Sequence, residues 1–202
     1  TDMDVNAYYN DASQEQAQLA KAVKLSEVLT AFQRHSGPKL IIVDTCRVDI
    51  HQGQRMTPDP AGAGAVQIPA NTLIAYATEP LTFAQDGLPG GHGPYAAALA
   101  AQLREKALPG DVFFRRVRTA VAAATRGQQQ QNPFIDSGTL FSDVRLGREV
   151  PGMSGPAAGA QAGQRVALVA GVSKYHKLAP LQNPYNDAAG MASALGRLGF
   201  AV

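Results

Sequence analysis

The stretch Lys39-Leu40-Ile41-Ile42-Val43-Asp44-Thr45-Cys46-Arg47 joins a short aliphatic run to an abrupt polar end. An apolar run of this length without polar alternation is typical of a strand buried on both faces of a parallel sheet. In an open α/β sheet, ligands bind beyond the carboxyl ends of the strands. We therefore expect residues 39–43 to form a buried strand, and Asp44 and Cys46 to lie where a ligand would bind.

The rest of the chain alternates between helical and extended patterns. Apolar residues recur at helical spacing within residues 11–34, 95–106, 111–125 and 187–198. Short apolar runs predict strands at residues 72–78, 139–146 and 166–171, with the start of another at 200–202. Strands that alternate with helices indicate an α/β fold, here a three-layer sandwich with a mostly parallel central sheet.

Three local expectations accompany these elements. Asn186 or Asp187 is expected to cap the last helix, because Asn and Asp side chains accept hydrogen bonds from the free N–H groups at a helix start. The polar tract Gln128–Gln131 is expected to lie in a surface loop. Residues 166–171 are expected to be a buried strand.

The composition excludes several kinds of protein and of site. The chain has 202 residues, enough for one domain with a substantial core, and its net charge of +2 includes no long basic run. Nucleic acid is therefore not an expected partner. No stretch is long and apolar enough to span a membrane, so we expect a soluble chain of the cytoplasm or periplasm. The single cysteine, Cys46, excludes a disulfide framework and a multi-cysteine zinc site, and no metal site is expected.

One internal segment divides the chain. Residues 151–164 are small, flexible and nearly uncharged, which is typical of a linker. The segment separates residues 1–150, which contain the strand that ends at Asp44, from residues 165–202, which are predicted to contain one strand and one helix.

Two roles are open to Cys46 at the end of its strand. A thiol that faces a cleft can act as a nucleophile when a neighbouring base activates it. A free cysteine can equally be a small buried hydrophobe, here tucked under the loop expected over residues 52–71.

The segment Leu40–Arg47 resembles the nucleophile strand of caspase-like cysteine peptidases, in the metacaspase, paracaspase and bacterial orthocaspase branch that has Asp-x-Cys. Three further segments agree with this resemblance: Thr72–Thr78 followed by Gly93-Pro94-Tyr95, Phe114–Val121, and Asn183-Pro184-x-Asn186-Asp187-Ala188. The resemblance implies a caspase-like sandwich. Residues 1–150 would supply the nucleophile strand and the small-subunit-like part, and residues 165–202 the first strand and helix.

The resemblance also implies an activity and a substrate class. The chain would be an endopeptidase with Cys46 as its nucleophile, acting on proteins or peptides. Asp44 would line the first specificity pocket and pair with Arg or Lys of the substrate, since a carboxylate pairs with a guanidinium and repels acidic side chains. Asp86 and Glu79 could add negative charge. The alternative role for Asp44 is a hydrogen-bonding residue that fixes the turn at the strand end.

The order of the segments departs from the family. There, the segment resembling residues 165–202 comes first, so this chain resembles a circular permutation in which residues 151–164 join the old ends. The family's segment with a catalytic His-Gly, and the strand before it, has no counterpart here. We expect the chain to be a fragment of a larger protein, to receive that segment from a second chain, or to use residues 1–9 in its place.

The base that would activate Cys46 is therefore not assigned. His92 lies in Gly91-His92-Gly93, which superficially matches the family's Gly-His-Gly, but no apolar strand precedes it. The remaining histidines, His35, His51 and His176, are expected at a helix end or in solvated loops.

Two other classes of function stay open. A pseudo-peptidase or interaction module would keep the fold without a catalytic histidine. A small-molecule-binding α/β domain would need a phosphate-loop motif, which the sequence lacks. The sequence assigns no cofactor and leaves calcium dependence open.

Overall fold

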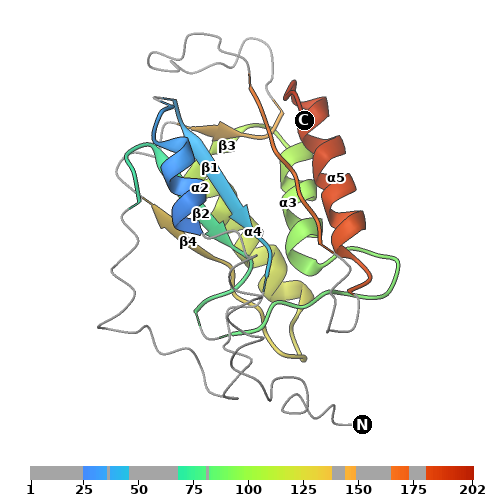
Figure 1. Ribbon diagram of the computed structural model, residues 1–202. Helices are drawn as coiled ribbons and strands as arrows, with labels where there is room; N and C mark the ends of the chain where they lie inside the picture. Colours follow the sequence, from blue (N-terminus) through green and yellow to red (C-terminus); the bar gives the residue numbers. More distant parts are fainter. Residues whose placement is uncertain are drawn as a thin grey trace, which may run out of the picture.

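The computed structural model describes residues 25–35, 37–45, 68–80, 82–137, 144–148, 165–172 and 181–202. Within this part, helices lie on both sides of a β-sheet (Figure 1). This arrangement confirms the predicted α/β sandwich. The expected linker at 151–164, the loop over residues 52–67, Cys46, His51 and His176 lie outside the described residues.

A three-stranded sheet contains the strand predicted at residues 39–43. β1 (Lys39–Val43) pairs in parallel with β2 (Thr72–Tyr76), from Lys39 opposite Thr72 to Val43 opposite Tyr76. β4 (Phe134–Ser137) pairs antiparallel with the other side of β2. Because β1 and β2 are parallel, their carboxyl ends lie together, and the Ala77 N–H donates to the Val43 carbonyl over 2.9 Å.

A second, smaller pairing lies apart from this sheet. β3 (Leu108–Pro109) and β5 (Arg145–Leu146) form a two-stranded antiparallel sheet, and Lys106 and Arg148 continue it as an isolated bridge.

The described part contains four helices: α2 (Leu25–Phe32), α3 (Pro94–Arg104), α4 (Gly110–Ala124) and α5 (Pro184–Arg197). α3 packs between α4 and α5. A proline opens both α3 and α5, at a position where its missing N–H costs no helical hydrogen bond. None of the described helices is long and apolar enough to cross a membrane.

The core is centred on β2 and α3. Leu73 and Ala75 of β2 belong to one buried cluster with residues of α3, α4 and α5, among them Tyr95, Phe113 and Met191. Ile74 alternates to the opposite face and is also buried. α2 covers that face, with Leu29 as its buried residue (Figure 1).

The predicted strands and helices agree well with the structure where apolar patterns are strong. The bounds of the strand at residues 39–43 are confirmed, and the strand at 72–78 ends at Tyr76. The expected burial of residues 39–43 is not confirmed, because β1 is an edge strand of the described sheet and only Lys39 is buried. The helices expected at 95–106 and 111–125 are α3 and α4. Of the strand expected at 139–146, the part that is described includes β5, which lies outside the main sheet.

The prediction of a buried strand at residues 166–171 is wrong for the described part of the chain. Its backbone is held by an isolated parallel bridge between Val166 and Ala201. The side chains of Val166 and Leu168 are 69% and 92% exposed. Only alternate residues turn inward, and Val169 packs against the core. The segment therefore has one covered face, whereas a strand buried on both faces needs two.

Two smaller expectations are wrong in whole or in part. α5 begins at Pro184, so the capping position is Asn183 rather than Asn186 or Asp187. Residues 128–130 are exposed as expected, but Gln131, the last residue of the tract, is fully buried. Its side-chain amide donates to the Ala77 carbonyl over 2.9 Å and accepts from the Gln85 N–H over 3.0 Å, which fixes the chain beyond the end of β2.

Candidate functional site

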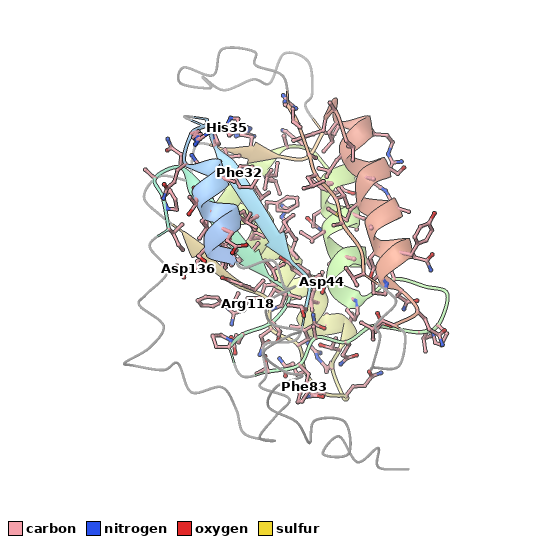
Figure 2. All side chains as sticks on the ribbon, in the orientation of Figure 1. Phe32, His35, Asp44, Phe83, Arg118 and Asp136 are labelled. Carbon is pink, nitrogen blue, oxygen red and sulfur yellow. The ribbon has the colours of Figure 1, made fainter. Side chains whose placement is uncertain are left out.

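The site begins where β1 ends. Asp44 directly follows Val43, at the end of β1 opposite to His35 (Figure 2). Cys46 comes two residues later and is outside the described residues. Two peptide steps of about 3.8 Å each keep its Cα within about 7.6 Å of the Asp44 Cα. Groups that surround Asp44 are therefore close to the expected nucleophile.

Three carboxylates act on one another electrostatically at this point: Asp44, Asp86 and Asp187, which we call the acidic cluster. Burial, followed by the charges of Asp187 and Asp86, raises the pKa of Asp44 to about 7. The Asp44 side chain is still exposed to solvent, although protein surrounds it on several sides. Water therefore reduces the rise in its pKa. Burial also raises the pKa of Asp187, while hydrogen bonds from His92 and Gly93 oppose the rise.

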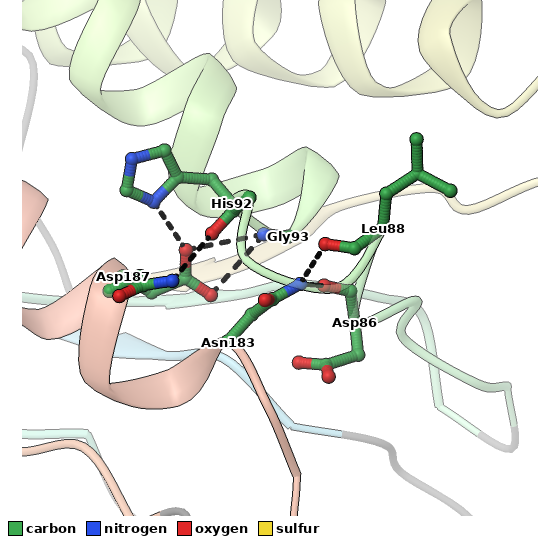
Figure 3. A network of polar contacts seen from close by, with 8 residues as sticks. Asp86, Leu88, His92, Gly93, Asn183 and Asp187 are labelled. Carbon is green, nitrogen blue, oxygen red and sulfur yellow. Dashed lines mark hydrogen bonds and ion pairs between the residues drawn. The ribbon is translucent and has the colours of Figure 1, made fainter.

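α5 clamps the loop that supplies Asp86. The Asn183 side-chain amide donates to the carbonyls of Asp86 and, over 2.8 Å, Leu88 (Figure 3). The Gln182 N–H approaches the Asp86 carboxylate at 3.4 Å. Gly87 makes the loop's turn possible: its φ is +79°, and a Cβ there would lie 2.4 Å from the His92 carbonyl oxygen.

The same helix fixes the end of that loop. The Asn186 amide donates to the Gly91 carbonyl over 3.2 Å. The Gly93 N–H donates to both carboxylate oxygens of Asp187, over 3.2 and 3.3 Å (Figure 3). Asp187 therefore links the first turn of α5 to the residue that precedes α3.

His92 is the histidine that the structure brings to this site. Its Nδ1 lies 2.8 Å from Asp187 Oδ1, with the His92 side chain 47% exposed and that of Asp187 16% exposed. Gly190 leaves room for the ring, because a Cβ there would lie 3.0 Å from His92 Cε1. Its Nε2 makes no hydrogen bond with a described residue. A histidine held at Nδ1 by a carboxylate presents Nε2 as a base.

Two buried oxygens beside the acidic cluster have no hydrogen-bond partner among the described residues, the Tyr95 hydroxyl and Asn183 Oδ1. Tyr95 and Asn183 are themselves almost fully buried. Burial and the charge of Asp44 raise the pKa of Tyr95. Buried polar atoms are normally paired, so these two oxygens are an exception among the described residues.

The oxygens of this site can accept hydrogen bonds from an organic cation. No group of three or more His, Cys, Asp and Glu side chains in the described ranges is arranged to hold a metal ion. A guanidinium or ammonium group, in contrast, brings several donors and a positive charge to dispersed acceptors. Glu79 does not join the cluster, because it pairs with Arg118 over 2.8 Å.

The sequence analysis identified Asp44, expected Asp187 only as a possible helix cap, and assigned no role to Tyr95 or Asn183. A signal was available in the spacing of Asn183, Asn186 and Asp187, which places three polar side chains on one face at the start of α5. What that face contacts depends on a loop about ninety residues away in the chain.

Residues 7–145 match the family model described as Peptidase_C14, Caspase domain. Among solved structures, the chain is similar to caspase-1 from Spodoptera frugiperda, with 22% sequence identity and a TM-score of 0.42. This similarity covers 57% of this chain and 51% of that one, so the chain spans about half the length of the insect caspase. No curated protein sequence matches the chain.

Proposed function

The chain belongs to the caspase-domain family Peptidase_C14, and from this premise we propose that it is a cysteine endopeptidase that cleaves peptide bonds after Arg or Lys. Cys46 is the proposed nucleophile and Asp44 the residue that binds the basic side chain. The Asp-x-Cys pattern supports this assignment through its resemblance to the metacaspase, paracaspase and orthocaspase branch.

The observation that supports basic specificity is the acidic cluster at the end of β1. Burial raises the pKa of Asp44, and the charges of Asp187 and Asp86 raise it further. A guanidinium bound among the three carboxylates would relieve their repulsion and form charge-assisted hydrogen bonds. An acidic substrate side chain would add a fourth negative charge, which disfavours caspase-type cleavage after Asp.

The proposed reaction needs a thiolate and a proton donor. Cys46 Sγ attacks the carbonyl carbon after the basic residue, and backbone N–H groups near Cys46 stabilise the oxyanion. The C–N bond then breaks as the base returns its proton to the leaving amine. Water hydrolyses the resulting thioester, which releases the carboxylate product and regenerates the thiol.

His92 is the proposed base. Its support is the 2.8 Å contact with Asp187, which orients the ring, together with the position of Asp187 beside Asp44. The alternative source is a histidine from a second chain or from a further segment of a longer protein. His35 is not a candidate, since it lies at the opposite end of β1 (Figure 2).

The activity is tested with a matched series of fluorogenic peptides that differ only in the residue before the cleaved bond. We expect cleavage after Arg and Lys, and none after Asp or after citrulline, which has nearly the shape of Arg without its charge. Cys46→Ala should abolish cleavage. Absence of turnover by the intact natural protein would refute the peptidase function. Binding of the Arg peptide without turnover would instead support a pseudo-peptidase.

A permuted segment order is part of the same proposal. The packing of α5 against α3, although α5 is last in the chain, supports it. A reordered chain with residues 165–202 placed before residue 1 should keep its circular dichroism spectrum and unfold cooperatively. Loss of cooperative unfolding in that chain would contradict the permutation.

A further inference from the structure

A second candidate site lies at the far ends of α3 and α5 from the acidic cluster. A cavity of about 230 Å³ is lined by Leu103, Arg104, Arg148, Ala194, Arg197 and Leu198. We propose that this cavity, with its three arginines, binds the phosphate groups of a small, multiply charged phosphate compound. The proposal does not depend on the peptidase function.

The backbone holds Arg148 beside the end of α3. The Ala107 N–H donates to the Arg148 carbonyl over 2.9 Å, and the Arg148 N–H donates to the Glu105 carbonyl over 2.7 Å. Gly147 allows this close approach: its φ is +114°, and a Cβ there would lie 2.8 Å from the Glu105 carbonyl oxygen. Arg148 is therefore fixed at the cavity by main-chain contacts that do not involve its guanidinium group.

The other two arginines reach the cavity from neighbouring helices. Arg104 is the last residue of α3 and Arg197 the last of α5. One nitrogen of Arg197 donates to Ser193 Oγ over 2.6 Å, which leaves its remaining donors available. Leu103 and Ala194 are buried below and provide an apolar floor.

The three charges are not neutralised by the described part of the protein. Arg115 and Arg118 of α4 pair with Asp111 and Glu79, whereas Arg104, Arg148 and Arg197 form no ion pair with a described residue. Glu105 adjoins Arg104 in the chain but forms no ion pair with the three within the described ranges.

Helix ends explain only two of these arginines. A cation at a helix C-terminus is stabilised by the helix dipole, which accounts for Arg104 and Arg197. Arg148 is on no helix, yet it lines the same cavity. Three arginines that line one small space favour a ligand with several negative charges and tetrahedral oxygens, because each guanidinium group that turns towards it can bind two oxygens.

The test uses inorganic pyrophosphate as the probe, titrated into the intact protein at constant ionic strength and followed by calorimetry and melting temperature. We expect saturable binding and a rise in melting temperature with the natural sequence. Arg148→Gln should weaken binding by about tenfold or more, as expected for loss of a charge-assisted contact. Arg116→Gln, which removes an exposed arginine of α4 away from the cavity, is the matched control.

Three results would overturn the proposal. The first is absence of saturable pyrophosphate binding. The second is an equal loss of pyrophosphate affinity in Arg148→Gln and Arg116→Gln. The third is that sulfate binds as tightly as pyrophosphate. If Arg148→Gln does not fold, Arg104→Gln and Arg197→Gln test the same cavity, and unchanged affinity in both would count against it.

Discussion

Asp44 lies at the end of β1, where burial, followed by the charges of Asp187 and Asp86, raises its pKa from an ordinary 3.8 to about 7. The folded protein therefore binds a proton at this residue more tightly than the unfolded chain does. Between these two pKa values, linkage makes the free energy of unfolding fall as pH rises. Ionised Asp44 therefore destabilises the fold at neutral and alkaline pH. This ionised form is the one that would bind the proposed substrate.

We predict that Asp44→Asn raises the melting temperature at pH 8 and leaves it nearly unchanged at pH 4. The amide has no charge to be repelled by Asp86 and Asp187, whereas at pH 4 the natural carboxyl is already largely protonated in the folded state. Thermal unfolding at the two pH values measures the difference. Asp136→Asn, an exposed position on β4, is the control and should show no such pH-dependent gain; an equal gain there would contradict the assignment.

The same substitution should have the opposite effect on activity. We predict that Asp44→Asn lowers kcat/KM for an Arg substrate by about two orders of magnitude, the scale for loss of one partner of a charge pair that the bound substrate covers from water. In the natural protein, kcat/KM should rise with pH as Asp44 ionises. Steady-state kinetics between pH 5.5 and 8.5 test both points, and an unchanged Arg preference in the variant would refute the role of Asp44.

His92 has a different expected signature. We predict that His92→Gln lowers kcat by about 100-fold or more, the usual contribution of a general base, and leaves KM for the Arg peptide much less affected. The pH profile of kcat separates this role from a structural one. If kcat is unchanged in the variant, the base comes from elsewhere. Mixing the protein with its catalytically inactive Cys46→Ala variant would then test whether a second chain supplies the histidine.

At the residue scale, sequence analysis succeeded where a residue's role depends on its neighbours in the chain. Asp44 is identifiable because it directly follows an aliphatic run, and the end of such a run is a place where ligands bind. Asp86 was named through the family resemblance as a residue that could add negative charge, but the involvement of Asp187 was not predictable in this way, because its position results from the clamp between α5 and a distant loop. Whether Cys46 is the nucleophile stays a prediction.

At the scale of elements, apolar runs predicted β1, β2, α3 and α4 because each buries a continuous set of side chains. β4 was missed, since Phe134 and Ile135 lie between polar residues and Ile135 is partly exposed. Residues 166–171 have the composition of a buried strand, yet their exposure depends on which strands lie beside them. Composition alone contains no information about those neighbours.

The start of α5 depends on a close contact that two glycine substitutions can test. A Cβ at Gly171 would lie 2.3 Å from the Pro184 carbonyl oxygen, whereas a Cβ at Gly196 would have no neighbour within 4 Å. We predict that Gly171→Ala destabilises the protein by about 2 kcal/mol through overpacking. Gly196→Ala should stabilise it by up to about 1 kcal/mol, because alanine favours the helical conformation and Gly196 lies in the last turn of α5.

Urea denaturation of both variants measures these effects. The two substitutions add the same methyl group at opposite ends of one structural unit, so each is the control for the other. Equal stability of both variants would show that Gly171 does not approach Pro184 closely in solution.

At the scale of the whole molecule, the family match covers residues 7–145 and the fold class agrees with it. The resemblance of residues 165–202 to the opening of the same domain is outside that match and stays a prediction. Sequence could indicate that these residues belong to a caspase-like sandwich. It could not show that α5 would lie against α3, because that contact joins segments about ninety residues apart.

α3 and α5 run side by side in the same direction (Figure 1). Asp187 lies in the first turn of α5, and Arg104 and Arg197 are the last residues of the two helices. The molecule is therefore electrically polarised, and a cationic peptide approaching from solution would be turned towards one end before it makes contact. Such long-range attraction acts on the rate of encounter and is screened over about 10 Å at 0.1 M salt. We predict that kcat/KM for an Arg peptide at pH 8 falls several-fold when the NaCl concentration of the assay is raised from about 20 to about 300 mM, while kcat stays nearly constant. A salt-independent kcat/KM would mean that substrates reach the acidic end by unguided diffusion.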